Sequence, residues 1–359
     1  MKYLLKGLGF ILTGCVSLFT TQLQGDYFDD TYPCCNNYVA NDCALCDDFF
    51  GKATFSADLL YWTARQQGLD YDITTSSTLA TVLGAEGLNV TQQADTTTHT
   101  SRYHFDWRLG YRFGLGYEFT ADGWNLFLNW THIPGKASGH REQTPGLLAT
   151  GSWRLTFDSV DALLRSPLYC TNSGFNWSFL AGVRAARINQ KIRARAPAFS
   201  FSPSQSPFFT TSVTISQSNS ITTNNYRGVG PEIGVNLSWD LCSGFSLFGK
   251  ANGTLLYSRA RQKNYFSNSN AITTFAAAPF VQISNSTFSF KNSNHFWQIV
   301  SDFAVGISWL QTVDFFECDS EFEMRLAWEH SQWYGHLHTR GGTNDLGFDG
   351  VTLSAALSY

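Results

Sequence analysis

Residues 103–119 read YHFDWRLGYRFGLGYEF and alternate between two kinds of side chain without interruption. Odd positions carry large apolar side chains, and even positions carry glycine, histidine or a charged residue. Because successive side chains of a β-strand point to opposite faces, this segment predicts one strand with an apolar face and a hydrophilic face. Strands of soluble domains average about five or six residues. A transmembrane β-barrel requires this longer pattern, since its outer face meets lipid and its inner face meets water.

The same alternation recurs in later segments, at 124–131, 226–239, 297–309 and 351–359. Trp297 and Trp309 stand at the two ends of one apolar stripe, as is typical of the aromatic girdles at the two membrane interfaces. The chain finishes on an aromatic residue, Tyr359. This last segment is similar to the terminal strand that the bacterial barrel-assembly machinery recognises, so we expect that machinery and outer-membrane lipid as partners.

The alternation predicts an all-β protein, a transmembrane antiparallel β-barrel of ten strands at 54–65, 102–120, 123–133, 151–164, 174–195, 225–240, 244–263, 294–311, 318–333 and 349–359. The connections alternate in length. Short turns on the periplasmic side and long loops outside are typical of outer-membrane barrels, which have an even strand number and periplasmic termini. A hairpin hidden in 66–101 would raise the strand number to twelve.

The N-terminus predicts a secretory signal peptide over 1–25. Lys2 and Lys6 precede an apolar run over 8–19 that is too short for a spanning helix. Residues 12–15, LTGC, also match a lipoprotein box, so cleavage before Cys15 is the alternative to cleavage near Gly25. A periplasmic segment over 26–53 and the barrel over 54–359 would follow. The net charge of −4 argues against nucleic acid as a partner.

Seven cysteines follow the signal, because the chain has eight and one of them is Cys15. They lie before the first strand or in predicted periplasmic turns, at Cys34, Cys35, Cys43, Cys46, Cys170, Cys242 and Cys318. Disulfides form in that compartment. Internal disulfides are one interpretation; because an odd number leaves one thiol over, links to other envelope proteins or to a second copy are the other. The spacing of the first four does not match a standard zinc site.

Five short segments carry a family resemblance: ADLLYW at 57–62, FDWRLGYR at 105–112, GLGY at 114–117, DSVD at 158–161 and AGVR at 181–184. They resemble the Legionella-type major outer-membrane porin family, which has similar members in environmental chlamydia-like bacteria. The resemblance covers about residue 50 to the C-terminus and implies a pore-forming protein of the bacterial outer membrane. The cysteine cluster departs from the Legionella members and is more like the disulfide-crosslinked envelope of chlamydia-like organisms.

Ionisable residues collect on the predicted inner face of the strands. We expect the following to line the lumen: Arg102, His104, Asp106, Arg108, Arg112, Glu118, Arg184, Glu232, Lys250, Asp302, Glu321, Glu323, Arg325 and Glu329. A barrel of about ten strands lies between those filled by side chains and those with an open channel. The mixed charges are therefore either a salt-bridged plug that stabilises the wall or a field that selects small solutes.

No catalytic, metal or cofactor site is expected. His330, His336 and His338 have the residue type of a protease or metal site, but they lie at a strand end and in a loop without a known pattern. The glycines at 228, 230 and 234 lack the helix that a dinucleotide loop requires. The sequence thus predicts a porin-like channel for passive diffusion of small hydrophilic solutes. The alternative is a structural or adhesive envelope barrel with little or no conductance.

The segments 196–224 and 264–290 contain no charged residue and mix Ser, Thr and Asn with Phe. Mobile loops are usually charged and poor in aromatic residues, so this composition predicts ordered β-structure at the outer face. Two uses are consistent with it: strands that continue above the membrane with packed aromatic side chains, or an exposed surface for glycans or host molecules.

Overall fold

The structure is a computed structural model that describes residues 52–80, 93–119, 123–144, 147–171, 174–203, 211–275, 280–315, 318–339 and 342–359. The predicted signal peptide, nearly all of the periplasmic segment and its four cysteines lie outside these residues. Among the described residues, no helix is long and apolar enough to cross a membrane.

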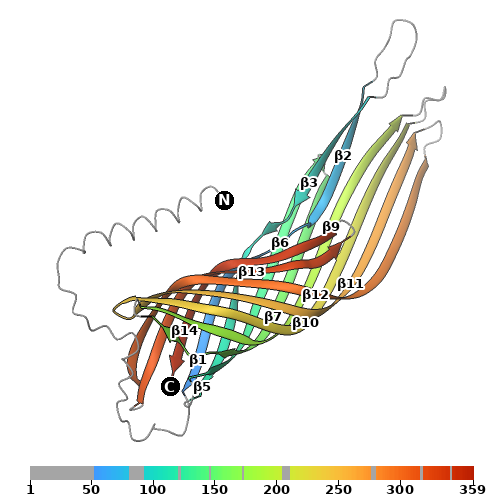
Figure 1. Cartoon of the computed structure of the whole chain (residues 1–359). Coiled ribbons are helices and arrows are strands. Elements are labelled where there is room, and N and C mark those ends of the chain that lie inside the picture. The colour runs from blue at the N-terminus through green and yellow to red at the C-terminus, as the bar shows by residue number, and fades with distance from the viewer. Residues whose placement is uncertain are drawn as a thin grey trace, which may run out of the picture. The chain divides into compact units, whose positions relative to one another are not determined.

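Ten antiparallel strands form a closed ring (Figure 1). They are β1 (Ala53–Gln66), β5 (Trp107–Glu118), β6 (Asn125–Thr144), β7 (Leu147–Arg165), β9 (Phe175–Pro203), β10 (Thr211–Cys242), β11 (Phe245–Phe275), β12 (Phe280–Phe315), β13 (Cys318–Thr339) and β14 (Gly342–Ser358). The ring closes where β14 pairs with β1. Closure pairs the backbone groups of every ring strand on both sides, as lipid requires. The predicted ten-stranded barrel is confirmed.

The hairpin considered within 66–101 exists but does not join the ring. β2 (Asp70–Ala80) and β3 (Gln93–Arg102) form a separate two-stranded sheet, so the barrel has ten strands and not twelve. Two short strands flank the ring: β4 (His104–Phe105) pairs with β6, and β8 (Tyr169–Cys170) pairs with β9.

Several strands extend far beyond their predicted ends on the side away from the start of β1 and the end of β14, as Figure 1 shows for β9 to β12. The uncharged segment 211–224 pairs in register with both neighbours, and 264–274 pairs with β12. The prediction of ordered β-structure is therefore confirmed for these residues. Ring contacts join Phe266 to Phe290 at 6.2 Å and Phe288 to Phe290 at 5.7 Å. These stretches are hydrogen-bonded strands, whereas the ten predicted strand ranges left them as loops.

The outward face of the ring is apolar. On β5, Leu109, Phe113 and Leu115 are 60%, 51% and 53% exposed, as expected for side chains that face lipid. On β12, Trp297 and Trp309 are twelve residues apart. That spacing is about 40 Å along a strand and about 30 Å across the bilayer at the tilt of 35–45° typical of such barrels. The two tryptophans therefore bracket a band that matches the membrane thickness.

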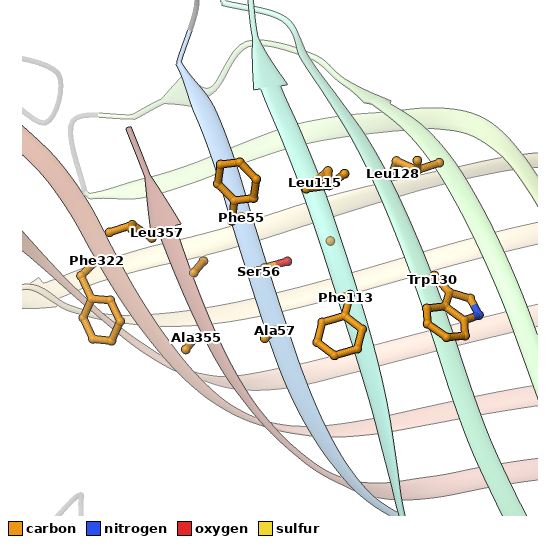
Figure 2. Close-up of a pocket in the computed structure, with 12 residues that line it drawn as sticks. Phe55, Ser56, Ala57, Phe113, Leu115, Leu128, Trp130, Phe322, Ala355 and Leu357 are labelled. Carbon is orange, nitrogen blue, oxygen red and sulfur yellow. The ribbon is translucent and has the colours of Figure 1, made fainter.

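The outward face also has an apolar hollow of about 510 Å³ over β13, β14, β1, β5 and β6 (Figure 2). Ala57 and Ala355 form its floor, and Phe113, Trp130 and Phe322 stand around it. The hollow exists because alanine replaces larger side chains at two adjacent outward positions. It is part of the lipid-facing band.

Tyr103 and Phe105, the first two aromatic residues of the segment 103–119, do not face lipid, contrary to the prediction. Tyr103 is 6% exposed and its hydroxyl donates to the Arg193 carbonyl, while Phe105 packs against the barrel core. The register with β6 shifts by one residue between β4 and β5, where the Asp106 amide bonds the Lys136 carbonyl. A one-residue slip turns every preceding side chain to the other face. His104, predicted to line the lumen, is therefore exposed on the outside.

Inward glycines allow neighbouring strands and side chains to approach closely. A Cβ atom on Gly110 would lie 2.6 Å from the His132 carbonyl oxygen. Gly110 lies on the inward parity, where a small polar side chain would suit the alternation. Gly110→Ser would nevertheless clash with the backbone and lower the unfolding free energy. An inward-facing glycine here is a packing requirement.

Charge placed on the outward face should cost stability according to depth. Phe113 lies midway between Trp107 and Tyr117, whereas Leu109 is one outward position from Trp107. We expect Phe113→Arg to cost about 2–4 kcal/mol of unfolding free energy and Leu109→Arg about 0–1 kcal/mol. Denaturant titration in lipid vesicles measures both, with Phe113→Leu as the uncharged control. Equal costs for the two arginines would contradict the assignment of the band.

Candidate functional site

The candidate site is the lumen, and its half nearer the termini is a layer of paired charges. The guanidinium group of Arg184 on β9 is at the centre of this layer and contacts three carboxylates from three different strands. Its Nε lies 2.7 Å from Asp161, one terminal nitrogen lies 3.0 Å from Glu232 and the other lies 2.5 Å from Asp302. Asn252 also donates to Glu232, at 2.6 Å. Arg184 and Glu232 are buried.

A second cluster in the same layer surrounds Arg112 on β5. Its guanidinium group forms two hydrogen bonds to the Glu329 carboxylate, at 3.2 and 2.9 Å, and a third to Asp58 at 3.1 Å. Thr131 accepts a bond from its Nε. Glu329 lies on β13, three strands away from β5 around the ring, so this fork crosses part of the lumen. Arg112 and Glu329, both predicted to line the lumen, thus pair directly.

The other predicted lumen residues are less central. Arg325 pairs with Glu323 on its own strand at 2.6 Å, Arg108 pairs with Asp106 at 3.3 Å, and Lys52 pairs with Glu321 at 2.7 Å. These six side chains are partly exposed, and the two others on the ring strands, Glu118 and Lys250, are half-buried. Arg102 ends β3, outside the ring.

The half of the lumen on the other side of this layer is apolar, which the sequence analysis did not anticipate. Large side chains from several strands pack there with almost no exposure. The fully buried aromatic residues are Trp153, Tyr226, Trp333 and Phe348, and Trp62 and Phe157 are nearly so. We call these six residues the aromatic layer. Leu60, Ile133, Ile188 and Leu256 fill the spaces between them.

The aromatic layer spans the lumen from wall to wall. Phe157 on β7 and Trp333 on β13 contact edge to face, with ring centres 5.5 Å apart. These two strands are five places apart around the ring in either direction, so they are diametrically opposite. Phe157 also contacts Phe348 at 5.0 Å, and Trp333 contacts Tyr226 at 5.9 Å. These contacts across the lumen are made by side chains alone, and no strand of the described chain crosses the lumen there.

Buried polar atoms lie on both sides of the aromatic layer. Glu232 Oε2 and Asn252 Oδ1 on one side, and Gln190 Oε1 and Gln298 Oε1 on the other, have no hydrogen-bond partner among the described residues. Buried polar groups in proteins are nearly always satisfied by protein or by ordered water. Water in the lumen would satisfy these four atoms.

Sequence reasoning missed two classes of lumen residue. Asp58 and Asp161 complete the two charge clusters. Both lie on the inward parity of their strands, so the alternation could have predicted them as lumen residues. The aromatic layer was missed because large aromatic side chains were assigned to lipid as a rule. Trp62 and Trp333 have the inward parity too.

The histidines at the outer end of β13 have structural partners. His330 Nδ1 lies 2.5 Å from Asp349 on the outer face, and inside the barrel the His336 ring contacts Tyr226 at a tilt and Trp333 edge to face. Cys170 ends β8, Cys242 ends β10 and Cys318 begins β13. All three therefore lie at the same end of the barrel as the termini, as the predicted topology requires.

Residues 51–358 match the family model described as Legionella pneumophila major outer membrane protein precursor. No curated protein is similar enough in sequence to match this chain.

Three solved structures are similar in fold. The outer membrane protease OmpT of Escherichia coli is 10% identical with a TM-score of 0.43, over 87% of this chain and 98% of that one. The attachment invasion locus protein Ail of Yersinia pestis is 11% identical with a TM-score of 0.24, over 87% and 100%. A Pseudomonas aeruginosa FadL homologue is 8% identical with a TM-score of 0.23, over 86% and 90%.

Proposed function

Because the chain belongs to the Legionella major outer membrane protein family, we propose that this outer-membrane barrel is a porin-like channel whose resting state is closed by the aromatic layer. Its cargo is small hydrophilic solutes that diffuse passively. The observation that carries the proposal is a hydrophilic lumen interrupted by one apolar constriction, at the contact of Phe157 with Trp333. Hydrophobic constrictions gate channels by excluding water.

The lining on either side of the constriction supports a hydrated path. Charged and amide side chains from six or more strands face the lumen, and several of their polar atoms require water as a partner. The constriction consists only of side chains, so rotation of a few of them changes the opening without moving the barrel. We assign the protein no catalytic activity.

Planar-bilayer recording of the refolded protein tests this proposal. We expect a low mean conductance made of brief openings separated by long closed periods, because the apolar constriction excludes water most of the time. The readout is the single-channel record in symmetric salt. A continuously open, large conductance would contradict the closed resting state. Complete absence of openings over a wide voltage range would overturn the channel proposal.

The second candidate is a structural envelope barrel, and the wall-to-wall contact of the aromatic layer favours it. In that function the charge clusters and the aromatic layer both serve as an internal core, and the protein contributes mechanical strength to the envelope. The absence of openings just described is the result that this candidate predicts.

We further propose that the cysteines ahead of the barrel link the protein to other envelope proteins or to a second copy. The cluster Cys34, Cys35, Cys43 and Cys46 together with three cysteines at the barrel end makes seven, an odd number. We expect disulfide-linked oligomers on non-reducing gels of native envelopes, and monomers after reduction. Thiols are alkylated before lysis, so that bonds formed during preparation are excluded. Monomers alone under those conditions would contradict the proposal.

A further inference from the structure

Basic side chains gather on the outer face of six adjacent strands, β6, β7, β9, β10, β11 and β12. The sequence places no Asp or Glu between Asp161 and Glu232, and none between Asp240 and Asp302. These two acid-free stretches contain most of the chain's exposed arginines and lysines. Pairing of the strands then brings these side chains together in two rows.

The first row consists of three arginines on three adjacent strands. In the register, Arg187 on β9 is opposite Arg227 on β10, and Arg227 is opposite Arg259 on β11. All three side chains are exposed and point outward, because their neighbours Tyr226 and Ser258 are buried in the lumen. Directly opposed residues in a sheet have Cβ atoms about 4.5–5.5 Å apart, and like charges at that distance repel.

The second row runs parallel to the first across six strands. Lys136 is opposite Arg154, Arg154 is opposite Lys191, and Lys263 is opposite Lys291. Thr223 joins the two halves of this row, between Lys191 and Lys263. All five basic side chains are exposed. We call the eight basic residues of the two rows the basic patch.

Carboxylates do not neutralise the basic patch. No ion pair is formed by any of the eight side chains within the described part of the chain. One acid, Asp158, is directly opposite Arg187 in the register, but it forms no ion pair with that arginine, and its Oδ1 is bound to His132 Nδ1 at 2.7 Å. Keeping so many cations side by side with a single acid beside them costs free energy unless an anion lies between them.

The first row of the patch adjoins the upper aromatic girdle. The next outward row toward the termini, below Arg187, Arg227 and Arg259, contains Trp130, Val160, Ala185, Val229, Tyr257 and Trp297. Trp297 is 63% exposed and Tyr257 is 52% exposed, as suits the aromatic girdle at the upper interface. The first row of arginines therefore begins where the apolar band ends.

We infer that the basic patch binds the phosphate groups of outer-leaflet lipid headgroups. Guanidinium groups recognise phosphate oxygens through paired hydrogen bonds, and lysines supply further charge. Phosphates between the opposed arginines relieve their mutual repulsion and fix the barrel's depth on one side. The ligand is a membrane lipid, since the patch adjoins the aromatic girdle and faces away from the lumen. This inference is independent of whether the lumen conducts.

The test compares the wild type with the triple variant Arg187→Gln, Arg227→Gln, Arg259→Gln, both refolded in neutral detergent. Each is titrated with diphosphoryl lipid A in mixed micelles, and bound phosphorus and the thermal midpoint are measured. Each basic side chain near an anionic surface contributes a factor of about five to binding. We therefore expect on the order of 100-fold weaker binding by the variant, and a thermal shift in the wild type alone. Salt at 1 M should remove most of the difference.

The control variant, Asn189→Gln, Thr223→Gln, Asn225→Gln, introduces the same side chain at neutral outward positions of two of the same strands, and it should bind as the wild type does. In lipid-free detergent the arginine variant should be at least as stable as the wild type, because repulsion is relieved, so a folding defect is recognisable. Equal lipid binding by the arginine variant and the wild type would overturn the inference. An equal thermal shift with inorganic phosphate at the same concentration would overturn it as well.

Discussion

Trp333→Ala is expected to raise the mean conductance of the barrel at least about tenfold, because it removes the largest side chain at the point where opposite walls meet. Trp333 has no solvent exposure and contacts Phe157, Tyr226 and His336. Its loss leaves space that is bordered by polar side chains on both sides, so water can connect the two halves of the lumen. The measurement is bilayer recording at fixed voltage and protein amount.

The matched control is Trp328→Ala on the same strand. Trp328 is 40% exposed on the outward face and packs against Trp107, so its removal should leave the conductance unchanged. Removing a buried tryptophan lowers the unfolding free energy by about 3–5 kcal/mol. The heat-dependent gel shift of folded barrels therefore serves to verify that each variant is folded. Phe157→Ala removes the other side of the same contact and should also open the lumen. Wild-type conductance in both folded variants would show that the aromatic layer does not limit flow.

Arg184→Ala is expected to lower the unfolding free energy by about 3–5 kcal/mol, because it leaves two buried carboxylates and one half-buried carboxylate without their shared cation. Asp161, Glu232 and Asp302 all bond this one guanidinium group. Their mutual repulsion in a medium of low dielectric then opposes folding. Denaturant titration of refolded protein in neutral lipid vesicles measures the loss. The deficit should shrink at acid pH, where protonation removes the repulsion.

Arg325→Ala is the comparison for that loss. Arg325 pairs with Glu323 at 2.6 Å, but its side chain is 44% exposed, and exposed pairs contribute only about 0–1 kcal/mol. Arg184→Met tests whether volume alone restores stability. A loss at Arg184 no larger than that at Arg325 would mean that the cluster is solvated and not a structural centre.

The alternation of side chains was sufficient to predict the barrel because it reports a local property. A residue's parity on a strand decides which face it joins, and lipid on one face demands apolar side chains there. Ten strands, their order and their short turns at Cys170, Cys242 and Cys318 followed from this rule. The uncharged stretches at 211–224 and 264–274 were also assigned to ordered β-structure on composition alone, and they are strands.

Parity failed where a local irregularity or a distant contact decided the outcome. The register slip at Asp106 moved Tyr103 inward and His104 outward. The alternating pattern of residues around Asp106 does not predict this slip. Trp62 and Trp333 have inward parity, yet whether inward aromatic residues line an open pore or fill it depends on how far apart the walls are. That distance depends on the number and tilt of all ten strands.

The sequence by itself therefore determined the barrel, its membrane band and which end carries the termini, because each depends on the period of side chains along a single strand. Only the tertiary structure decided that Arg184 and Arg112 are neutralised, that Phe157 meets Trp333 across the lumen, and that Arg187, Arg227 and Arg259 form a row. Each of these contacts joins residues from different strands, and their proximity arises from the register and closure of the whole ring.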